Sequence, residues 1–410
     1  MSKVERAFRL IIVFGLVLTT AFSMPFELSA ANATEQGLKS VSPSSTFHDT
    51  LDKAYLYGVR GQFNKSIPLF EQLLKSHPEE WIVYDFYDQI LELKGDFPGA
   101  EQILKQALEK NLSNQKEQIE ARLNTLEEKK EFAQAMKAAP SWTGAQVFGN
   151  QEFVIKTNIP EIYHRPLIEH LGDLLRKEKK LMTDILGPEK KPASYVKVLI
   201  VGRYSEYLTL MDEWKKKFED VGGGRPLGGH GSKGFIDNHE NEIVIYFDGS
   251  WDWYAMAYGM AHCLLGNFYA SSPSRFASEG LAQYISYKLE KKDAKSEILS
   301  KLEFINFLYG QGELEHAMAV FSHWPGYGMT RSDEQMFALM SWSLTYFFIE
   351  RGHPVFKDFF EQYLKYEREN ASNDMNTSHD CFTQHLSQAQ MNELDKEWIK
   401  FILGITYEKI

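Results

Sequence analysis

The sequence predicts an α+β protein, and three observations carry that prediction. A stretch in the first third of the chain repeats itself with the spacing of paired helices. Short runs rich in β-branched residues then alternate with helical periodicity, as in a small sheet covered by helices. After Trp251 the pattern is helical throughout. We therefore expect helical repeats over 46–136, a mixed domain over 145–290 and a C-terminal helical part over 291–410.

The segment 1–33 has the features of a secretory signal peptide. Three cations, Lys3, Arg6 and Arg9, precede an uncharged stretch from Leu10 to Met24. Ala31-Asn32-Ala33 then offers the small side chains that a signal peptidase accepts. Because a bilayer-spanning helix needs about 20 apolar residues, which is more than this stretch provides, we expect cleavage rather than anchoring. The mature protein is expected to be secreted or periplasmic, with no stable membrane insertion.

Composition and charge narrow the class of protein. With 43% apolar and 25% charged residues and only 2 Cys, the chain is typical of a globular protein that is not stapled by disulfides. Its formal net charge is −11, and the Lys clusters at 177–180 and 215–217 are short, so a nucleic-acid partner is not expected. Cys263 and Cys381 would meet oxidising conditions after export, and the sequence leaves open whether they pair.

The repeated segment has the period of tetratricopeptide repeats. Gly61-Gln62-Phe63 recurs as Gly95-Asp96-Phe97, and the small residues Ser66 and Ala100 fall at matching positions. A small residue there permits two helices to approach closely, while the aromatic residue fills the space between helices. A weaker third copy is expected over 123–135, with Phe132 one residue out of register. A generic helical bundle remains the alternative.

Such an array offers a surface for partner docking. Stacked repeats line a concave face with their first helices, and the positions expected to point into it are Lys53, Tyr55, Asp85 and Tyr87. Aromatic groups supply contact area and charged groups fix orientation, which suits a protein or peptide partner. The alternative is that so short an array merely supports the domain that follows it.

The domain after the repeats is expected to alternate strands and helices. A Gly-rich loop at 222–231 is not a phosphate cradle, because no Gly-Lys-Ser/Thr opens a helix after it. Helical spacing over 332–350 indicates a core helix. The other expected elements, in chain order, are a strand at 153–155, a helix at 166–185, a strand at 196–201, a helix at 205–218, and a hairpin of 234–236 with 243–247.

Two helices after the hairpin carry the residues of greatest functional interest. The first bears His262, and the second opens Phe276-Ala277-Ser278-Glu279-Gly280-Leu281-Ala282-Gln283-Tyr284. This arrangement resembles the gluzincin zinc peptidases, and more narrowly the bacterial peptidase-MA-like proteins of unknown function that also carry tetratricopeptide repeats. In that family HExxH on the first helix supplies two zinc ligands and a general base, and a Glu on the second helix supplies the third ligand. The resemblance implies that His262 and Glu279 are ligand positions.

The resemblance implies a degenerate catalytic site, because the HExxH position reads Tyr258-Gly259-Met260-Ala261-His262. Tyr258 stands for the first ligand, and a neutral phenol is a poor zinc ligand. Gly259 stands for the general base and has no side chain to accept a proton. Two remaining ligands fall short of the three that a catalytic zinc takes from protein. We therefore expect an exported, non-catalytic pseudo-metallopeptidase that binds a protein or peptide, without a cofactor.

Other histidines leave a metal site open as an alternative. His230 or His239 borders the same cleft in this architecture, so a zinc-dependent peptidase with a rearranged site would use one of them with His262 and Glu279. His379-Asp380-Cys381 with His385 also has ligand types, but its polar surroundings favour a surface loop. For His262 itself we favour a hydrogen bond to Glu279 between the two helices. The expected cleft is bordered by His230, Tyr258, His262 and Glu279.

Overall fold

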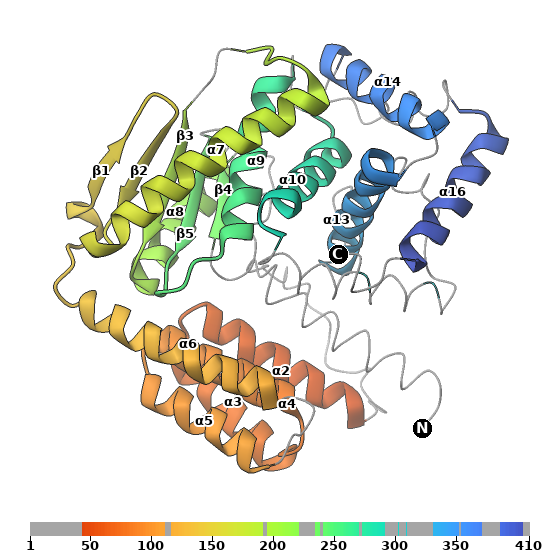
Figure 1. The fold of residues 1–410 in the computed structure, drawn as a ribbon. Coiled ribbons are helices and arrows are strands. Elements are labelled where there is room, and N and C mark those ends of the chain that lie inside the picture. Colours follow the sequence, from red (N-terminus) through yellow and green to blue (C-terminus); the bar gives the residue numbers. More distant parts are fainter. Residues whose placement is uncertain are drawn as a thin grey trace.

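The structure is a computed structural model that combines a group of helices with a sheet-containing part (Figure 1). The residues it describes are 43–110, 116–191, 195–220, 234–237, 241–269, 273–291, 302, 309, 331–351, 354–370 and 386–404. The expected signal peptide, the loop at 222–231, His230, His239, His379, Cys381 and His385 lie outside these residues. Within them, helices pack on a five-stranded mixed sheet, in agreement with the expected α+β class.

Among the described residues, helices α2 to α6 precede the sheet and lie beneath it in Figure 1. Consecutive helices pack against each other, and their core is separate from that of the sheet. Their bounds are α2 Pro43–Val59, α3 Phe63–Ser76, α4 Trp81–Lys94, α5 Phe97–Glu109 and α6 Lys116–Ala135. Helices α3 and α5 begin at Phe63 and Phe97, the two aromatic residues that the sequence repeat aligns.

Local sequence explains why these helices turn where they do. Gly61 and Gly95 adopt positive φ values of 71° and 81°, which glycine tolerates without steric cost at the end of a helix. Asp96 then caps α5 by accepting a hydrogen bond from the Gly99 amide at 3.1 Å. The small side chain of Ser66 lets α3 approach α2 closely. Its hydroxyl donates a hydrogen bond to the Ala54 carbonyl at 2.6 Å.

The prediction of a third copy of the repeat over 123–135 is wrong. The segment 116–135 is one continuous helix, α6, and not the second half of a helix pair. Phe132 leaves the repeat core and packs against the sheet-containing part, where its ring centroid lies 4.8 Å from that of Phe247. Gly249 makes this possible, because a Cβ there would lie 2.8 Å from the Phe132 Cβ. Helix α6 therefore joins the repeats to the sheet.

The sheet has the strand order β1-β2-β3-β5-β4. Strands β2, β3 and β5 run parallel, and β1 and β4 are antiparallel edge strands. Alternate residues of β5 face opposite sides, so Ile243 joins the core beneath α9 whereas Val244 and Tyr246 pack against α8. The bounds are β1 Gln146–Gly149, β2 Phe153–Thr157, β3 Val196–Val201, β4 Gly234–Asp237 and β5 Glu242–Tyr246.

The helices around the sheet follow the expected order. They are α7 His164–Leu186, α8 Tyr204–Asp220, α9 Trp253–Phe268 and α10 Arg275–Leu289, with short 3-10 turns at Trp142–Gly144 and Glu161–Tyr163. The predicted strand at 196–201 matches β3, and the predicted hairpin is the antiparallel pair β4 and β5. Strand β1 is an addition that the sequence analysis did not anticipate.

Helix α13 packs against α10, and the C-terminal helices share one hydrophobic core with the sheet (Figure 1). They are α13 Arg331–Tyr346, a π-helical turn η5 at Phe347–Arg351, α14 Pro354–Asn370 and α16 Gln388–Leu403. The expected core helix at 332–350 is therefore confirmed, with its last turn widened. Among the described residues, no helix is both long and apolar enough to cross a membrane.

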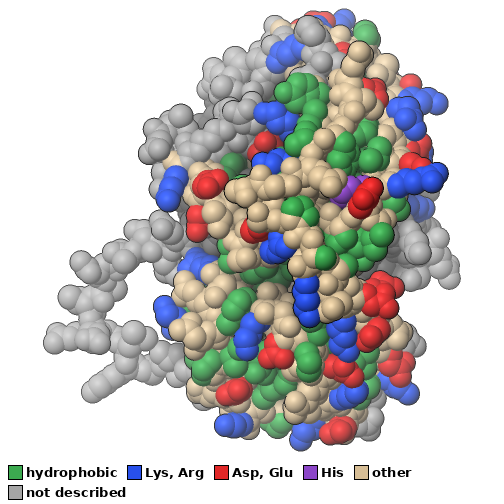
Figure 2. All heavy atoms as spheres, turned by 90° about the vertical axis from the view of Figure 1, so that its left-hand side faces the viewer, with side chains coloured by type: hydrophobic (Ala, Val, Ile, Leu, Met, Phe, Trp, Pro, Cys, Tyr) green, Lys and Arg blue, Asp and Glu red, His purple; other side chains and the backbone are tan. Residues whose placement is uncertain are grey.

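Charged side chains are interspersed on the face that Figure 2 shows. Lys177 pairs with Asp173 at 2.6 Å on the exposed side of α7, and both side chains are about half exposed. Such pairs at helical spacing are solvated and add little stability. Lys177 and Lys180 therefore point to water, whereas Glu178 of the same cluster is fully buried.

Candidate functional site

Helices α9 and α10 form the pair that the motif predicts, and each begins at a capping side chain. Asp252 accepts a hydrogen bond from the Ala255 amide at 2.9 Å and starts α9. Ser274 accepts from the Ala277 amide at 3.2 Å and starts α10. The two helices are in close contact along their length. Tyr258, His262 and Glu279 consequently meet between them, as the sequence predicts.

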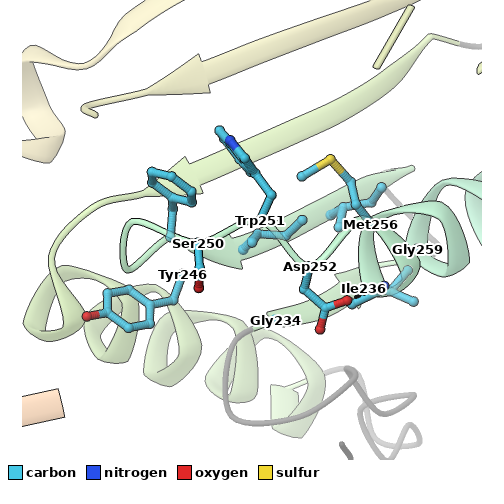
Figure 3. A pocket seen from close by; sticks show the side chains of 12 residues that line it. Gly234, Ile236, Tyr246, Ser250, Trp251, Asp252, Met256 and Gly259 are labelled. Carbon is cyan, nitrogen blue, oxygen red and sulfur yellow. Dashed lines mark hydrogen bonds between the residues drawn. The ribbon is translucent and has the colours of Figure 1, made fainter. Parts of the chain in front are cut away.

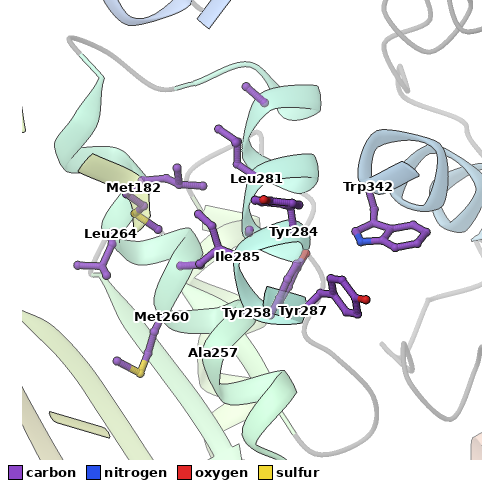
Figure 4. Close-up of a cluster of buried hydrophobic side chains, with 14 of the residues drawn as sticks. Met182, Ala257, Tyr258, Met260, Leu264, Leu281, Tyr284, Ile285, Tyr287 and Trp342 are labelled. Carbon is purple, nitrogen blue, oxygen red and sulfur yellow. The ribbon is translucent and has the colours of Figure 1, made fainter. Parts of the chain in front are cut away.

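The central contact joins Tyr258 to Glu279. The Tyr258 hydroxyl donates a hydrogen bond to Glu279 Oε2 at 2.7 Å. Tyr258 is buried, and the Glu279 side chain is only 12% exposed, so little water competes for this bond. Figure 4 shows Tyr258 among the side chains that fill the space between α9 and α10. Tyr258, at the first ligand position of the motif, thus provides a hydrogen-bond donor to Glu279, at the third ligand position.

The expected hydrogen bond between His262 and Glu279 is not the one that forms. His262 Nε2 lies 3.9 Å from Glu279 Oε2, which is beyond hydrogen-bond distance. The His262 ring instead meets the Tyr258 ring edge-on, with centroids 4.5 Å apart. The reason is geometric, because residues 258 and 262 share one face of α9 and the longer phenol reaches the carboxylate first. Tyr258, not His262, therefore donates the short hydrogen bond to Glu279.

Gly259 faces the sheet rather than Glu279. A Cβ at this position would lie 3.0 Å from Ile243 Cγ2 and 3.3 Å from its Cδ1, tighter than ordinary van der Waals contact. Ile243 is itself buried on β5. A cavity of about 30 Å³ between α9 and the β4–β5 hairpin is lined by Gly259, Ile236 and Asp252 (Figure 3). Such a volume holds a water molecule or two, and a larger residue at 259 has to displace Ile243.

The second helix is held against α13 by the glycine of its motif. A Cβ on Gly280 would collide with Thr345 Oγ1 and would lie 2.7 Å from the Ser341 carbonyl oxygen. Only glycine permits this separation of α10 and α13. Gln283 strengthens the crossing by donating to the Ala338 carbonyl at 3.2 Å. Glu279 thus places a carboxylate between α9 and α10, and the adjacent Gly280 lets the opposite side of α10 pack closely against α13.

The remaining motif tyrosine also has a structural partner. The Tyr284 hydroxyl donates to Glu350 Oε1 at 2.7 Å, and Lys288 Nζ lies 2.6 Å from the same oxygen. Burial, together with the hydrogen bond to Glu350, raises the pKa of Tyr284. Tyr287 lies near Trp342 of α13, with ring centroids 6.3 Å apart (Figure 4). This end of α10 is a packed junction with the C-terminal helices.

Among the described residues, the side chains that meet at this site do not fit a catalytic zinc; His230 and His239 lie outside these residues. Two candidate ligands, His262 and Glu279, meet here, whereas such a zinc takes three from protein. The carboxylate oxygen nearest His262 already accepts the Tyr258 hydrogen bond. Within the described ranges no three His, Cys, Asp or Glu side chains gather as ligands would. Cys263 is buried on the same helix, and its sequence neighbour His262 points in another direction.

The predicted docking residues on the repeats separate into two groups. Lys53 is exposed on α2, and the Asp85 side chain is 20% exposed on α4. Tyr55 and Tyr87 were expected on the concave face, and the structure corrects this, because both are buried in the repeat core. Tyr87 stacks on Phe70 with ring centroids 5.2 Å apart. The two tyrosines hold helices together and offer little surface to a partner.

Sequence reasoning missed a second site, a cavity of about 650 Å³ between the repeats and the sheet. Asp85 lines it from α4, Arg122 and Lys129 line it from α6, and Tyr204 lines it from the start of α8. The only signal in the sequence was the acidic spacing of α4, where Asp85, Asp88 and Glu92 recur at helical intervals.

Comparison with known proteins does not assign either site. No family model matches the chain, and no curated protein matches its sequence. The chemistry of the two sites therefore has to be argued from their side chains. At the helix pair these are a phenol, an imidazole and a carboxylate, with glycine at the position that the motif gives to its general base. At the cavity they are carboxylates and bases drawn from distant parts of the chain.

Proposed function

We propose that the protein is an exported, non-catalytic relative of the gluzincin zinc peptidases, and that it acts as a scaffold for a protein or peptide. The observation that carries this proposal is the hydrogen bond from Tyr258 to Glu279. Through this bond the Glu279 carboxylate, a potential metal ligand, joins α10 to α9. A phenol releases its proton only near pH 10, so this arrangement favours packing over metal binding at neutral pH.

The order of elements supports the relationship to gluzincins. The β4–β5 hairpin is followed by α9 and α10, which bring His262 and Glu279 to one place. The lack of a side chain at Gly259 supports the non-catalytic part of the proposal. A general base has to lie within hydrogen-bond reach of the water that it deprotonates. Gly259 instead packs on Ile243, so restoring a base requires a second change in the sheet.

The helices before the sheet support the scaffold part. Helices α2 to α5 form two consecutive pairs, and the sequence repeat that aligns Phe63 with Phe97 has the spacing of tetratricopeptide repeats. Lys53 is exposed and remains available to a partner, whereas Asp85 is 20% exposed and lies 3.5 Å from Arg122. Removing the repeats by truncation at Ser141 is not a clean test, because residues 132 and 136 belong to the core of the sheet. Point substitutions on the repeat surface are the appropriate perturbation.

Two measurements on the exported protein test the proposal. Intact-mass analysis is expected to show a chain that begins at or within a few residues of Thr34, and retention of Met1 in a membrane fraction would contradict export. Incubation with unstructured peptides is expected to give no cleavage. Zinc-dependent cleavage that disappears with Glu279→Ala, but persists in the matched surface variant Glu101→Ala, would favour a rearranged peptidase instead.

A further inference from the structure

The cavity between the repeats and the sheet has the size of a ligand-binding site. Its volume of about 650 Å³ falls within the range of small-molecule pockets. One wall is α4 and α6 of the repeats, and the opposite wall is formed where β3 and β5 end, around Gly202 and Tyr246. Ligands of sheets with parallel strands commonly bind at the carboxyl ends of those strands. The position and the volume are thus both suited to a ligand.

The wall on α4 and α6 holds an excess of carboxylates. Arg122 contacts three of them, with nitrogen–oxygen distances of 3.5 Å to Asp85, 2.8 Å to Asp88 and 3.3 Å to Glu92. Asp88 lies behind the lining residues, is fully buried, and its Oδ1 accepts no hydrogen bond from the described residues. Burying a charged oxygen without a donor is unfavourable. One guanidinium is therefore too little donor capacity for this wall.

Lys129 does not remove the excess of acidic over basic side chains. It pairs with Glu92 and lies 3.2 Å from Asp248, the residue that follows β5 and Phe247. Among the described residues, the three acidic side chains that α4 brings together, Asp85, Asp88 and Glu92, thus pair with the two bases Arg122 and Lys129 of α6. The carboxylates of α4 outnumber these bases by one.

The other cationic side chains that line the cavity, Arg203 and Lys94, already have hydrogen-bond or ion-pair partners. The Arg203 guanidinium donates to the carbonyls of Met136, Ala139 and Pro140 at 3.0, 2.7 and 2.6 Å. Lys94 lies 3.5 Å from Asp96 at the solvent side, where its side chain is 41% exposed. Among the described residues the cavity therefore offers no surplus of cationic donors to an anion, whereas the Asp85 carboxylate, 20% exposed and 3.5 Å from its nearest guanidinium nitrogen, faces it.

We infer that this cavity binds an organic cation, an ammonium or guanidinium group that completes the acidic network beside Asp85. The cation belongs either to a free amine or to a Lys or Arg side chain of a peptide. Phe63, Phe97 and Phe132 on the same lining provide apolar surface for the carbon chain that carries the charge. This site is separate from the α9–α10 pair, so its test does not depend on the metal chemistry of Tyr258 and Glu279.

Binding is coupled to proton release. Burial raises the pKa of Asp88 well above its usual range; Arg122 opposes this, and the neighbouring Asp85 and Glu92 carboxylates add to it. Burial likewise raises the pKa of Asp85, against the lowering effect of Arg122. A bound cation favours the ionised carboxylates and displaces the protons that they hold. Affinity for the cation accordingly rises with pH.

Isothermal titration calorimetry on the full mature chain tests the site. The probes are agmatine, putrescine and an end-blocked Gly-Lys-Gly peptide, with succinate as the anionic counterpart, each in phosphate and in HEPES buffer. We expect saturable binding of a cationic probe, with a buffer-dependent enthalpy that reports proton release. Asp85→Asn is expected to weaken binding about tenfold or more. Glu101→Gln, which changes a paired carboxylate outside the cavity, is the matched control and leaves the affinity unchanged.

A steric variant keeps the test decisive if the charge variant alters folding. Ser205 is exposed at the start of α8 and lines the cavity, so Ser205→Trp is expected to block binding without changing any charge. Agmatine or putrescine binding alone identifies a free amine, and peptide binding alone identifies a side chain. The inference is overturned by any of three results: no cationic probe binds, succinate binds more tightly, or a folded Asp85→Asn or Ser205→Trp variant retains wild-type affinity.

Discussion

Replacing Glu178 is expected to stabilise the protein. This carboxyl group lies on α7, is fully buried, and neither of its oxygens has a hydrogen-bond partner among the described residues. Burial raises its pKa well above the usual value of 4.5, and the nearby Glu290 carboxylate adds to the shift. Glu178→Met fills similar space without polar atoms. Glu178→Gln keeps a polar group and removes only the titration.

The magnitude and its pH dependence follow from this environment. A buried polar group without a partner costs about 1–3 kcal/mol, so Glu178→Met is expected to raise the free energy of unfolding by about that amount. Because the folded state raises the pKa, Glu178 contributes most stability below pH 4.5 and loses it as pH rises through the folded pKa. Glu178→Gln is therefore expected to match the wild type near pH 4 and to be more stable at pH 8.

Guanidinium unfolding from pH 4 to pH 8, followed by circular dichroism, measures both effects. The stability difference between Glu178→Gln and wild type should grow with pH, whereas Glu178→Met should be more stable at every pH. Equal stability of all three proteins across the range would refute the reasoning, because it would mean that the carboxyl group has a polar partner in solution. Loss of stability in both variants would show that Glu178 is ionised and favourably paired.

The helix contacts give further predictions, each measured as the free energy of unfolding. Gly280→Ala is expected to destabilise by about 1–3 kcal/mol, because the new Cβ would lie 2.7 Å from the Ser341 carbonyl oxygen. Gly266→Ala is the matched control within α9; nothing lies within 4 Å of its Cβ position, so a gain of up to about 1 kcal/mol is expected, and destabilisation would contradict the packing. Ser387→Ala removes the capping box of α16 and is expected to cost about 1 kcal/mol, whereas an unchanged stability would show that the helix end frays.

Much of the fold was predictable because its signals are local. The glycines at 61 and 95 end helices, Asp252 and Ser274 begin them, and the β-branched run at 196–201 reads as a buried strand. Strand β1 was not predictable in the same way. It is short and mostly exposed, and Val147 is 64% exposed, so no apolar alternation marks it. Its formation depends on pairing with β2.

The sites were harder to predict because they depend on three-dimensional contacts. The motif brought Tyr258, His262 and Glu279 together correctly, but their hydrogen bonding depended on which side chain reaches the carboxylate first. Tyr55 and Tyr87 were misplaced because helical spacing alone does not tell the core face from the concave face when both carry aromatic residues. The large cavity joins segments that are far apart in the sequence, and no local pattern announces it.

Zinc content before and after restoring the motif tests the central claim most directly. Elemental analysis of the purified mature protein is expected to find far less than one equivalent of zinc. The variant Tyr258→His with Gly259→Glu, made together with Ile243→Ala to remove the Cγ2 and Cδ1 atoms that crowd position 259, is expected to take up about one equivalent and to lose it on adding Glu279→Ala. One equivalent of zinc in the wild-type protein that disappears with Glu279→Ala would contradict the account, because the α9–α10 pair would then be a working metal site.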